Sequence, residues 1–263
     1  MSAVLERQAN RIATATPLLL GIIVLAWLLA IVAELTGRVQ WVHHHQLLVD
    51  DMTLWSSLIL FLLAWQLHIA AMMLPSSLPM IGLFRQAAAG QPHPGVARVC
   101  FLGGYLLVWT MFGVLALLGD TLLGMALSDW HWLMRRPEWL MGAVLVLAGA
   151  FQFTSLKSRC LDKCRQPRSF LLAHYRRGWG GAMALGVRHG LFCLGCCWAL
   201  MLVMFVVGIA NLAWMAPLAA LMIYEKIGRH GDRLVRPAGT ALILLGALVF
   251  IGPAWMPTLV HMH

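Results

Sequence analysis

The longest apolar run in the chain is AMALGVRHGLFCLGCCWALMLVMFVVG, residues 182–208. About 20 predominantly apolar residues are enough for an α-helix to cross the hydrocarbon core of a bilayer. Six further runs of this kind lie at 17–35, 54–74, 96–118, 139–156, 212–227 and 238–256. We therefore expect an all-α fold, a polytopic bundle of about seven transmembrane helices that forms a single integral membrane domain over residues 1–263.

The composition of the chain agrees with this class. Of its 263 residues, 61% are hydrophobic and 11% are charged, and the mean hydropathy is +0.80. An ordinary soluble domain has about 25% charged residues, and so much apolar surface would not stay dissolved in water. Soluble enzymes, soluble nucleic-acid readers and disordered tails are excluded together.

Basic residues are distributed unevenly between the expected spans. With the N-terminus in the cytoplasm, 16 of the 19 Lys and Arg residues lie inside, and only Arg38, Arg135 and Arg136 lie outside. Cytoplasmic loops carry this excess in membrane proteins. We expect a cytoplasmic N-terminus, an external C-terminus and no nucleic-acid partner for the net charge of +9. Asn211 and Pro217 leave one alternative, in which the fifth and sixth runs form a re-entrant segment and one span.

The end of the second run carries a first group of candidate metal ligands. His68 and Met72 are four residues apart and share a helix face, and Met73 follows. A histidine inside a membrane span usually faces the bundle interior. Pro75 and Pro79 remove helical N–H donors, which indicates irregular backbone beside a cavity.

The fifth run carries a second group. Three potential ligands lie on one stripe of this helix, His189, Cys193 and Cys196, and Cys197 lies about 80° around the helix from His189. Gly190 and Gly195 would let another helix approach closely. Helix rise also puts His68 and His189 at similar depths, so we expect His68, Met72, His189 and Cys193 to surround one site in the inner half of the membrane.

A third group of ligands follows the fourth run. Cys160 and Cys164 are spaced so that both thiols could meet one ion or each other, and neighbouring basic side chains would favour thiolate. We expect them to form a secondary pair on a basic, solvated cytoplasmic loop at 157–181. Outside, His43–His45, His131 and the tail at 261–263 could collect metal. Glu225 and Lys226 end the sixth run, where we expect an interfacial ion pair.

Three strings in this chain carry a family resemblance. They are AMMLPS at 71–76 with Pro79 and Met80, Cys160-x3-Cys164-Arg165, and CLGCCWALM at 193–201. Together they resemble a bacterial family of predicted metal-binding integral membrane proteins, a domain of unknown function, over about residues 54–226. The resemblance implies a bacterial inner-membrane protein with a metal site drawn from His68, Met72, Met73, Cys193, Cys196 and Cys197. Many members of that family carry Met where this chain has His68.

The donor types favour one ion. Thioether and thiolate groups favour Cu(I), and thiolate with imidazole also suits zinc. We expect a protein that binds a soft transition metal, Cu(I) first and zinc second, and moves it across the bilayer or supplies it to a membrane or periplasmic acceptor. Two alternatives stay open. One is an enzyme, a membrane thiol-disulfide oxidoreductase that uses Cys193-x2-Cys196, and the other is a structural or assembly subunit of a membrane complex.

Overall fold

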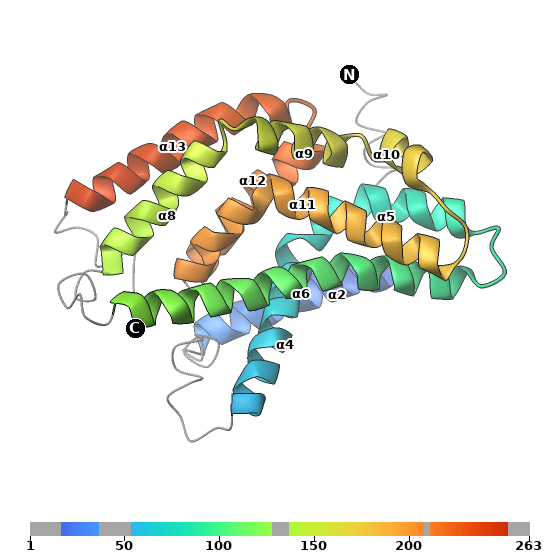
Figure 1. The fold of residues 1–263 in the computed structure, drawn as a ribbon, viewed down its shortest axis with the longest axis horizontal. Helices are drawn as coiled ribbons and strands as arrows, with labels where there is room; N and C mark the ends of the chain where they lie inside the picture. The colour runs from blue at the N-terminus through green and yellow to red at the C-terminus, as the bar shows by residue number, and fades with distance from the viewer. Residues whose placement is uncertain (1–16, 37–53, 128–136, 208–210, 252–263) are drawn as a thin grey trace.

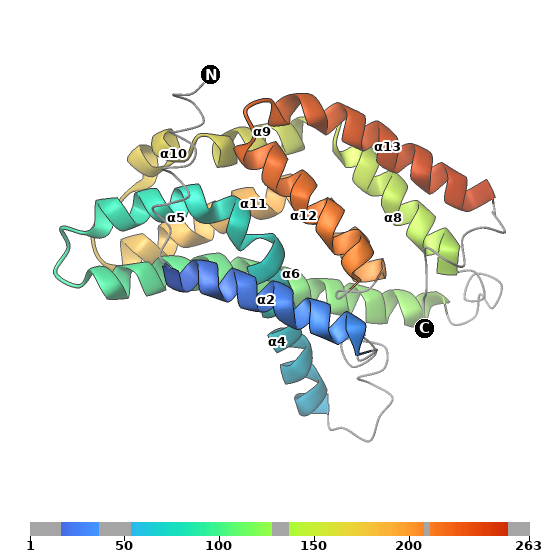
Figure 2. The ribbon, with the colours of Figure 1, turned by 180° about the vertical axis from the view of Figure 1, so that it is seen from behind.

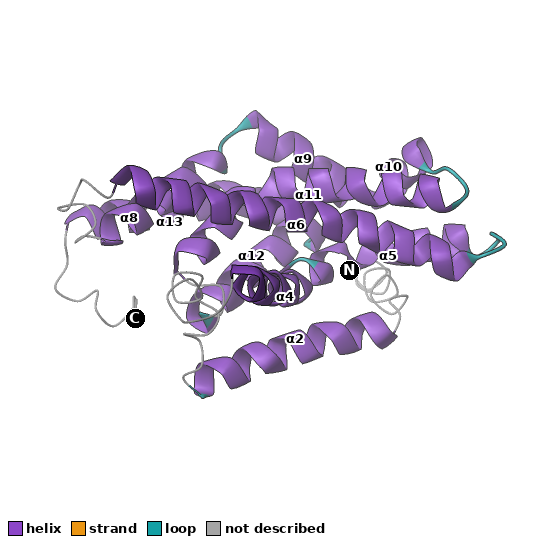
Figure 3. Ribbon diagram, turned by 60° about the horizontal axis from the view of Figure 1, so that its bottom comes forward, coloured by secondary structure: helices purple, strands orange, loops and turns teal. Residues whose placement is uncertain are grey.

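The computed structural model describes residues 17–36, 54–127, 137–207 and 211–251 (Figure 1). Within these ranges the chain is all-α, as expected, and contains no strand (Figure 3). The helices are α2 (Pro17–Leu35), α4 (Leu54–Met72), α5 (Leu74–Ala88), α6 (Pro94–Leu127), α8 (Pro137–Phe151), α9 (Ser155–Arg165), α10 (Pro167–His174), α11 (Trp179–Val207), α12 (Leu212–Ile227) and α13 (Gly231–Ile251).

Five of these helices are long and apolar enough to cross a membrane, namely α2, α4, α6, α11 and α13. Helices α8 and α9 qualify only as a pair, which is bent by 66°, and α12 has only 16 residues. Each of the seven expected runs overlaps a helix. The number of crossings and the side of the N-terminus stay predictions.

The basic segment 157–181 is not the solvated loop that the sequence suggested, because most of it is helical. The Thr154 hydroxyl caps α9 by accepting a 3.2 Å hydrogen bond from the backbone N–H of Lys157. Pro167 stands in the first turn of α10, where its missing N–H costs nothing. One face of α9, with Lys157, Cys160 and Leu161, is buried against the bundle, while Arg159 and Lys163 on its other face are exposed.

Close backbone contact joins α6 to α11, which run side by side (Figure 1). A Cβ added at Gly186 would lie 2.0 Å from the carbonyl oxygen of Phe101, and one at Gly104 would lie 2.4 Å from a carbonyl oxygen of α11. Helices α8 and α13 make the same kind of contact through Gly149 and Gly239. Small residues that let backbones approach are typical of helix pairs in membranes.

A break between α4 and α5 sets the position of Met73. Pro75 lies in the first turn of α5 and has no N–H, so the carbonyl of Ala71 loses its helical donor. The indole Nε1 of Trp27, on α2, donates to that carbonyl at 3.1 Å. Figure 2 shows α2 passing this junction. The proline-induced break leaves Met73 at a corner of the chain, and its carbonyl and thioether face other helices.

Candidate metal centre

Three buried sulfur atoms gather at one point inside the bundle, and we call Met73, Cys193 and Cys197 the sulfur cluster. Met73 comes from the break between α4 and α5, and the two cysteines come from α11. The Sγ of Cys197 lies 3.7 Å from the Sδ of Met73. All three residues are at most 1% exposed. The cluster therefore joins parts of the chain that are 124 positions apart.

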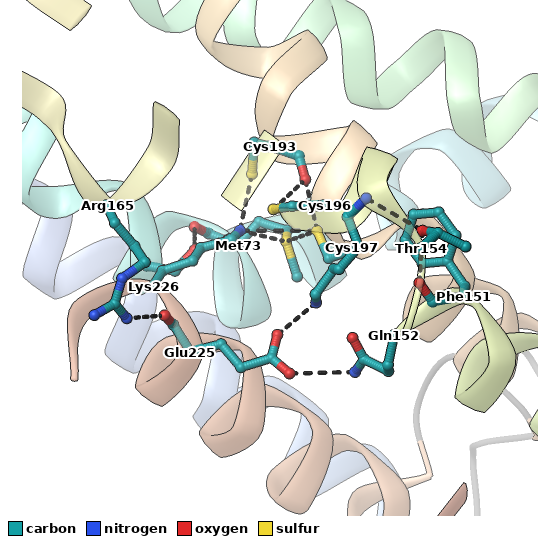
Figure 4. Close-up of polar contacts among 12 residues, drawn as sticks. Met73, Phe151, Gln152, Thr154, Arg165, Cys193, Cys196, Cys197, Glu225 and Lys226 are labelled. Atoms are coloured by element: carbon teal, nitrogen blue, oxygen red, sulfur yellow. Dashed lines mark hydrogen bonds and ion pairs between the residues drawn. The ribbon is translucent and has the colours of Figure 1, made fainter. Parts of the chain in front are cut away.

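The ammonium of Lys226 lies at the centre of the sulfur cluster (Figure 4). Its Nζ is 3.1 Å from the Sγ of Cys193, 3.7 Å from the Sγ of Cys197 and 4.0 Å from the Sδ of Met73. It also donates to the Oγ of Ser76 at 3.2 Å. Lys226 ends α12 and is buried, so a third part of the chain brings a cation to the sulfur atoms.

Tyr105, on α6, closes another side of the sulfur cluster. Its hydroxyl lies 3.2 Å from the Sγ of Cys193, accepts a hydrogen bond from Ser77 at 3.1 Å and donates to the carbonyl of Met73 at 3.5 Å. The ring of His189 stacks on the ring of Tyr105, with centroids 5.5 Å apart. His189 therefore reaches the cluster through Tyr105.

The remaining candidate cysteines lie on the side of α11 that faces α9. The thiol of Cys196 donates to the carbonyl of Cys193 at 3.1 Å, and its side chain interacts with that of Cys164. A Cβ added at Gly195 would lie 2.7 Å from the Sγ of Cys160. The absence of a side chain at Gly195 thus admits α9, as the sequence predicted for a close helix contact. The pairing of Cys160 with Cys164 stays a prediction, and in the structure Cys164 interacts with Cys196.

His68 and Met72 occupy the last two turns of α4. Both residues are buried, and the His68 ring stacks on that of Trp65 with centroids 5.7 Å apart. His189 instead stacks on Tyr105, and its Nε2 has no hydrogen-bond partner among the described residues. Across the described part of the chain, no three His, Cys, Asp or Glu side chains are grouped closely enough to hold a metal ion. The sulfur cluster is not such a group, because it combines two cysteines with a methionine and a lysine.

Glu225 and Lys226 do not form the interfacial pair that their adjacency suggested. The carboxylate of Glu225 is bound by Lys157 of α9 at 2.5 Å and by the amide of Gln152 at 3.2 Å (Figure 4). Arg165 also donates to the backbone carbonyl of Glu225. Successive residues on a helix point in different directions, so Glu225 faces α9 while Lys226 faces the sulfur cluster.

Comparison with protein families matches residues 62–249, more than half of the chain, to PpoB2, which is described as a copper chaperone. The chain belongs to the PpoB2 copper chaperone family. Comparison with curated proteins and with solved structures gave no match. The matched range includes all three residues of the sulfur cluster together with Tyr105 and Lys226.

The chemistry of the cluster fits the cargo of such a family. Two thiols and a thioether are soft donors, which suit Cu(I), and they already surround a positive charge. Sequence reasoning named the three sulfur residues but missed Tyr105 and Lys226 as parts of the centre. The one sequence signal for Lys226 was its position at the end of an apolar run. The external histidines His43–His45, His131 and residues 261–263 lie outside the described residues.

Proposed function

We propose that this protein binds Cu(I) within a bacterial inner membrane and passes it to a membrane or periplasmic acceptor. Met73, Cys193 and Cys197 are the proposed ligands. The observation that carries this proposal is the convergence of three buried sulfur atoms on one cation, Lys226 Nζ, at 3.1–4.0 Å. A site that already accommodates an ammonium has room for a cation and donors of the type that Cu(I) prefers.

The other candidate ligands extend this site in two directions. Cys196 leads from the sulfur cluster to Cys164, and Cys160 lies against the same face of α11. These thiols offer a path by which Cu(I) would enter or leave at α9. His189 stands behind Tyr105 with a free ring nitrogen, so we assign it a supporting position, and we keep His68 and Met72 as secondary ligands.

The test is Cu(I) binding by the purified full-length protein in detergent, measured by competition with a chromogenic Cu(I) chelator. We expect Cys193→Ser, Cys197→Ser and Met73→Leu each to weaken binding, the cysteine changes by roughly 100-fold, since losing a coordinating group has effects of at least 10–100-fold. Because the structure gives sulfur contacts to Met73, Met73→Leu should weaken binding more than Met72→Leu.

Matched controls are available in the same chain. Cys100 is a half-buried cysteine on α6, and Met141 is a buried methionine on α8. Neither belongs to the sulfur cluster, so Cys100→Ser and Met141→Leu should leave Cu(I) affinity unchanged. Cu(I) binding that is equally sensitive to the control and cluster substitutions would refute the proposed site.

One contact favours the oxidoreductase as a second candidate. The side chains of Cys164 and Cys196 interact although they come from α9 and α11, and two thiols that can reach each other can form a reversible disulfide. Mild oxidation of the metal-free protein followed by peptide mapping would detect this bond. If the Cys164–Cys196 disulfide forms rapidly and reversibly and the protein binds copper only substoichiometrically, the redox function is preferred over the copper function.

A further inference from the structure

Lys226 is an unusual cation because it has no acidic partner within the described part of the chain. Among the described residues, no carboxylate oxygen lies within ion-pairing distance of its Nζ, since the recorded ion pairs are Lys157–Glu225 and Arg165–Asp232. A buried charge needs compensation by an opposite charge and by hydrogen bonds. Here the available groups are the two thiols of the sulfur cluster and the hydroxyl of Ser76.

Among the described residues, no other formally charged side chain makes a recorded contact with the ammonium of Lys226. The neighbouring carboxylate of Glu225 is already neutralised by Lys157. Tyr105 and Ser76 contribute hydroxyl groups, and Met73 contributes a thioether. The charge of a loaded site is therefore decided by its thiolates, the bound ion and the ammonium.

Counting these charges separates monovalent from divalent ions. Two thiolates with one Cu(I) carry a net charge of −1, which the ammonium of Lys226 brings to zero. Two thiolates with one Zn(II) are already neutral, so the same ammonium leaves a buried charge of +1. Because uncompensated buried charge is strongly unfavourable, the site with Lys226 favours the monovalent ion.

The position of Ser76 allows the ammonium to remain in a loaded site. Its Oγ lies 3.2 Å from Nζ and is not a soft metal ligand. Ser76 is itself held in place by a 2.9 Å hydrogen bond to the carbonyl of Met73. A small shift of Lys226 toward Ser76 would free the sulfur atoms while keeping the positive charge beside them.

We propose that Lys226 is a specificity-determining residue, whose ammonium makes the Cys193–Cys197 site selective for monovalent Cu(I) over divalent ions. This inference rests on the proposed function, since it takes Cys193 and Cys197 as the copper ligands. It assigns Lys226 no bond to the metal. The residue acts through charge alone. Its role is measured by the selectivity ratio, the dissociation constant for Zn(II) divided by that for Cu(I).

The experiment measures Cu(I), Ag(I) and Zn(II) dissociation constants for the purified full-length protein in detergent, under reducing conditions. The variants are Lys226→Gln and Lys226→Met, which remove the charge, and Lys226→Arg, which keeps it. Lys163→Gln removes one exposed charge from α9 and is the matched control. We expect the preference for Cu(I) and Ag(I) over Zn(II) to fall roughly 100-fold in the Gln and Met variants, an effect of the order caused by an unpaired buried charge.

The Arg variant and the Lys163→Gln control should keep the preference for monovalent ions. A general loss of structure would weaken all three ions together, whereas the proposal requires weaker Cu(I) and Ag(I) binding with stronger Zn(II) binding. An unchanged selectivity ratio in folded Gln or Met variants would overturn the inference. So would a folded Arg variant that behaves like the Gln variant.

Failure of the underlying copper site gives a different result. In that case the Cys193→Ser variant would bind Cu(I) as tightly as the wild-type protein does, and the proposed function would fail together with this inference. If Cys193→Ser abolishes Cu(I) binding while Lys226→Gln leaves selectivity intact, only the role of Lys226 is wrong.

Discussion

Replacing Glu225 with Gln tests the buried ion pair that orients α12. The Nζ of Lys157 and the Oε2 of Glu225 are 2.5 Å apart, and their side chains are 1% and 2% exposed. Glu225→Gln removes the anion and leaves the Lys157 ammonium buried without a carboxylate. Removing one partner of a buried pair costs about 3–5 kcal/mol, and at about 2–4 °C per kcal/mol this corresponds to a decrease in Tm on the order of 10 °C.

The assay is thermal unfolding of the metal-free protein in detergent, followed by tryptophan fluorescence. An internal control is Asp232→Asn, because the Arg165–Asp232 pair is 3.5 Å long and its side chains are 20% and 66% exposed. An exposed pair of this kind contributes less than about 1 kcal/mol, so Tm should fall by only a few degrees. The double variant Glu225→Gln with Lys157→Met should recover much of the loss, since it also removes the unpaired ammonium.

The same substitution should affect copper. Glu225 is adjacent to Lys226, and its contacts to α9 fix the rotation of α12 that directs Lys226 to the sulfur cluster. Cu(I) affinity should therefore fall in Glu225→Gln and recover in part in the double variant. If the free energy of unfolding of Glu225→Gln lies within about 1 kcal/mol of the wild-type value, the pair is not a buried stabilising contact.

Three further predictions follow from the packing and the charge distribution. Gly195→Ala should push α9 away and raise the rate at which Cys160 is alkylated, because the new Cβ would lie 2.7 Å from the thiol sulfur; an unchanged rate would contradict the close contact. His189→Ala should weaken Cu(I) binding more than His68→Ala, because the His189 ring stacks on Tyr105 beside the sulfur cluster and the His68 ring stacks on Trp65; equal effects would contradict this. A reporter after Gly178 should be cytoplasmic and one at the C-terminus external; both on one side would exclude seven spans.

The helices were predictable because long apolar runs have few other stable conformations in a bilayer. The runs at 17–35 and 212–227 coincide with α2 and α12. The segment 157–181 was misjudged because its basic composition is typical of a solvated loop. Its helix signals, a capping Thr154 and Pro167 in a first turn, were nevertheless present in the sequence.

The candidate site was predictable in its residue types but not in its partners. Helix periodicity selected Cys193 together with His189 and Cys196, and the family resemblance added Met73 and Cys197. In the structure Met73, Cys193 and Cys197 meet around Lys226. Helix rise gives the depth of a residue but not the direction of its side chain, so equal depth did not reveal that His68 and His189 stack on different rings. Contacts such as Lys226 with Cys193 depend on how α12 packs against α11, which no local pattern encodes.

The sulfur cluster and its cation come from three separate parts of the chain, which has a consequence for biosynthesis. Met73 is made early, the two cysteines of α11 much later, and Lys226 only when α12 has been completed. Since domains form as synthesis proceeds from the N-terminus, a nascent chain that ends before α12 has the thiols but lacks the cation at their centre. A ribosome-bound intermediate of that length would expose uncompensated soft ligands, and only completion of α12 would give the site its final charge.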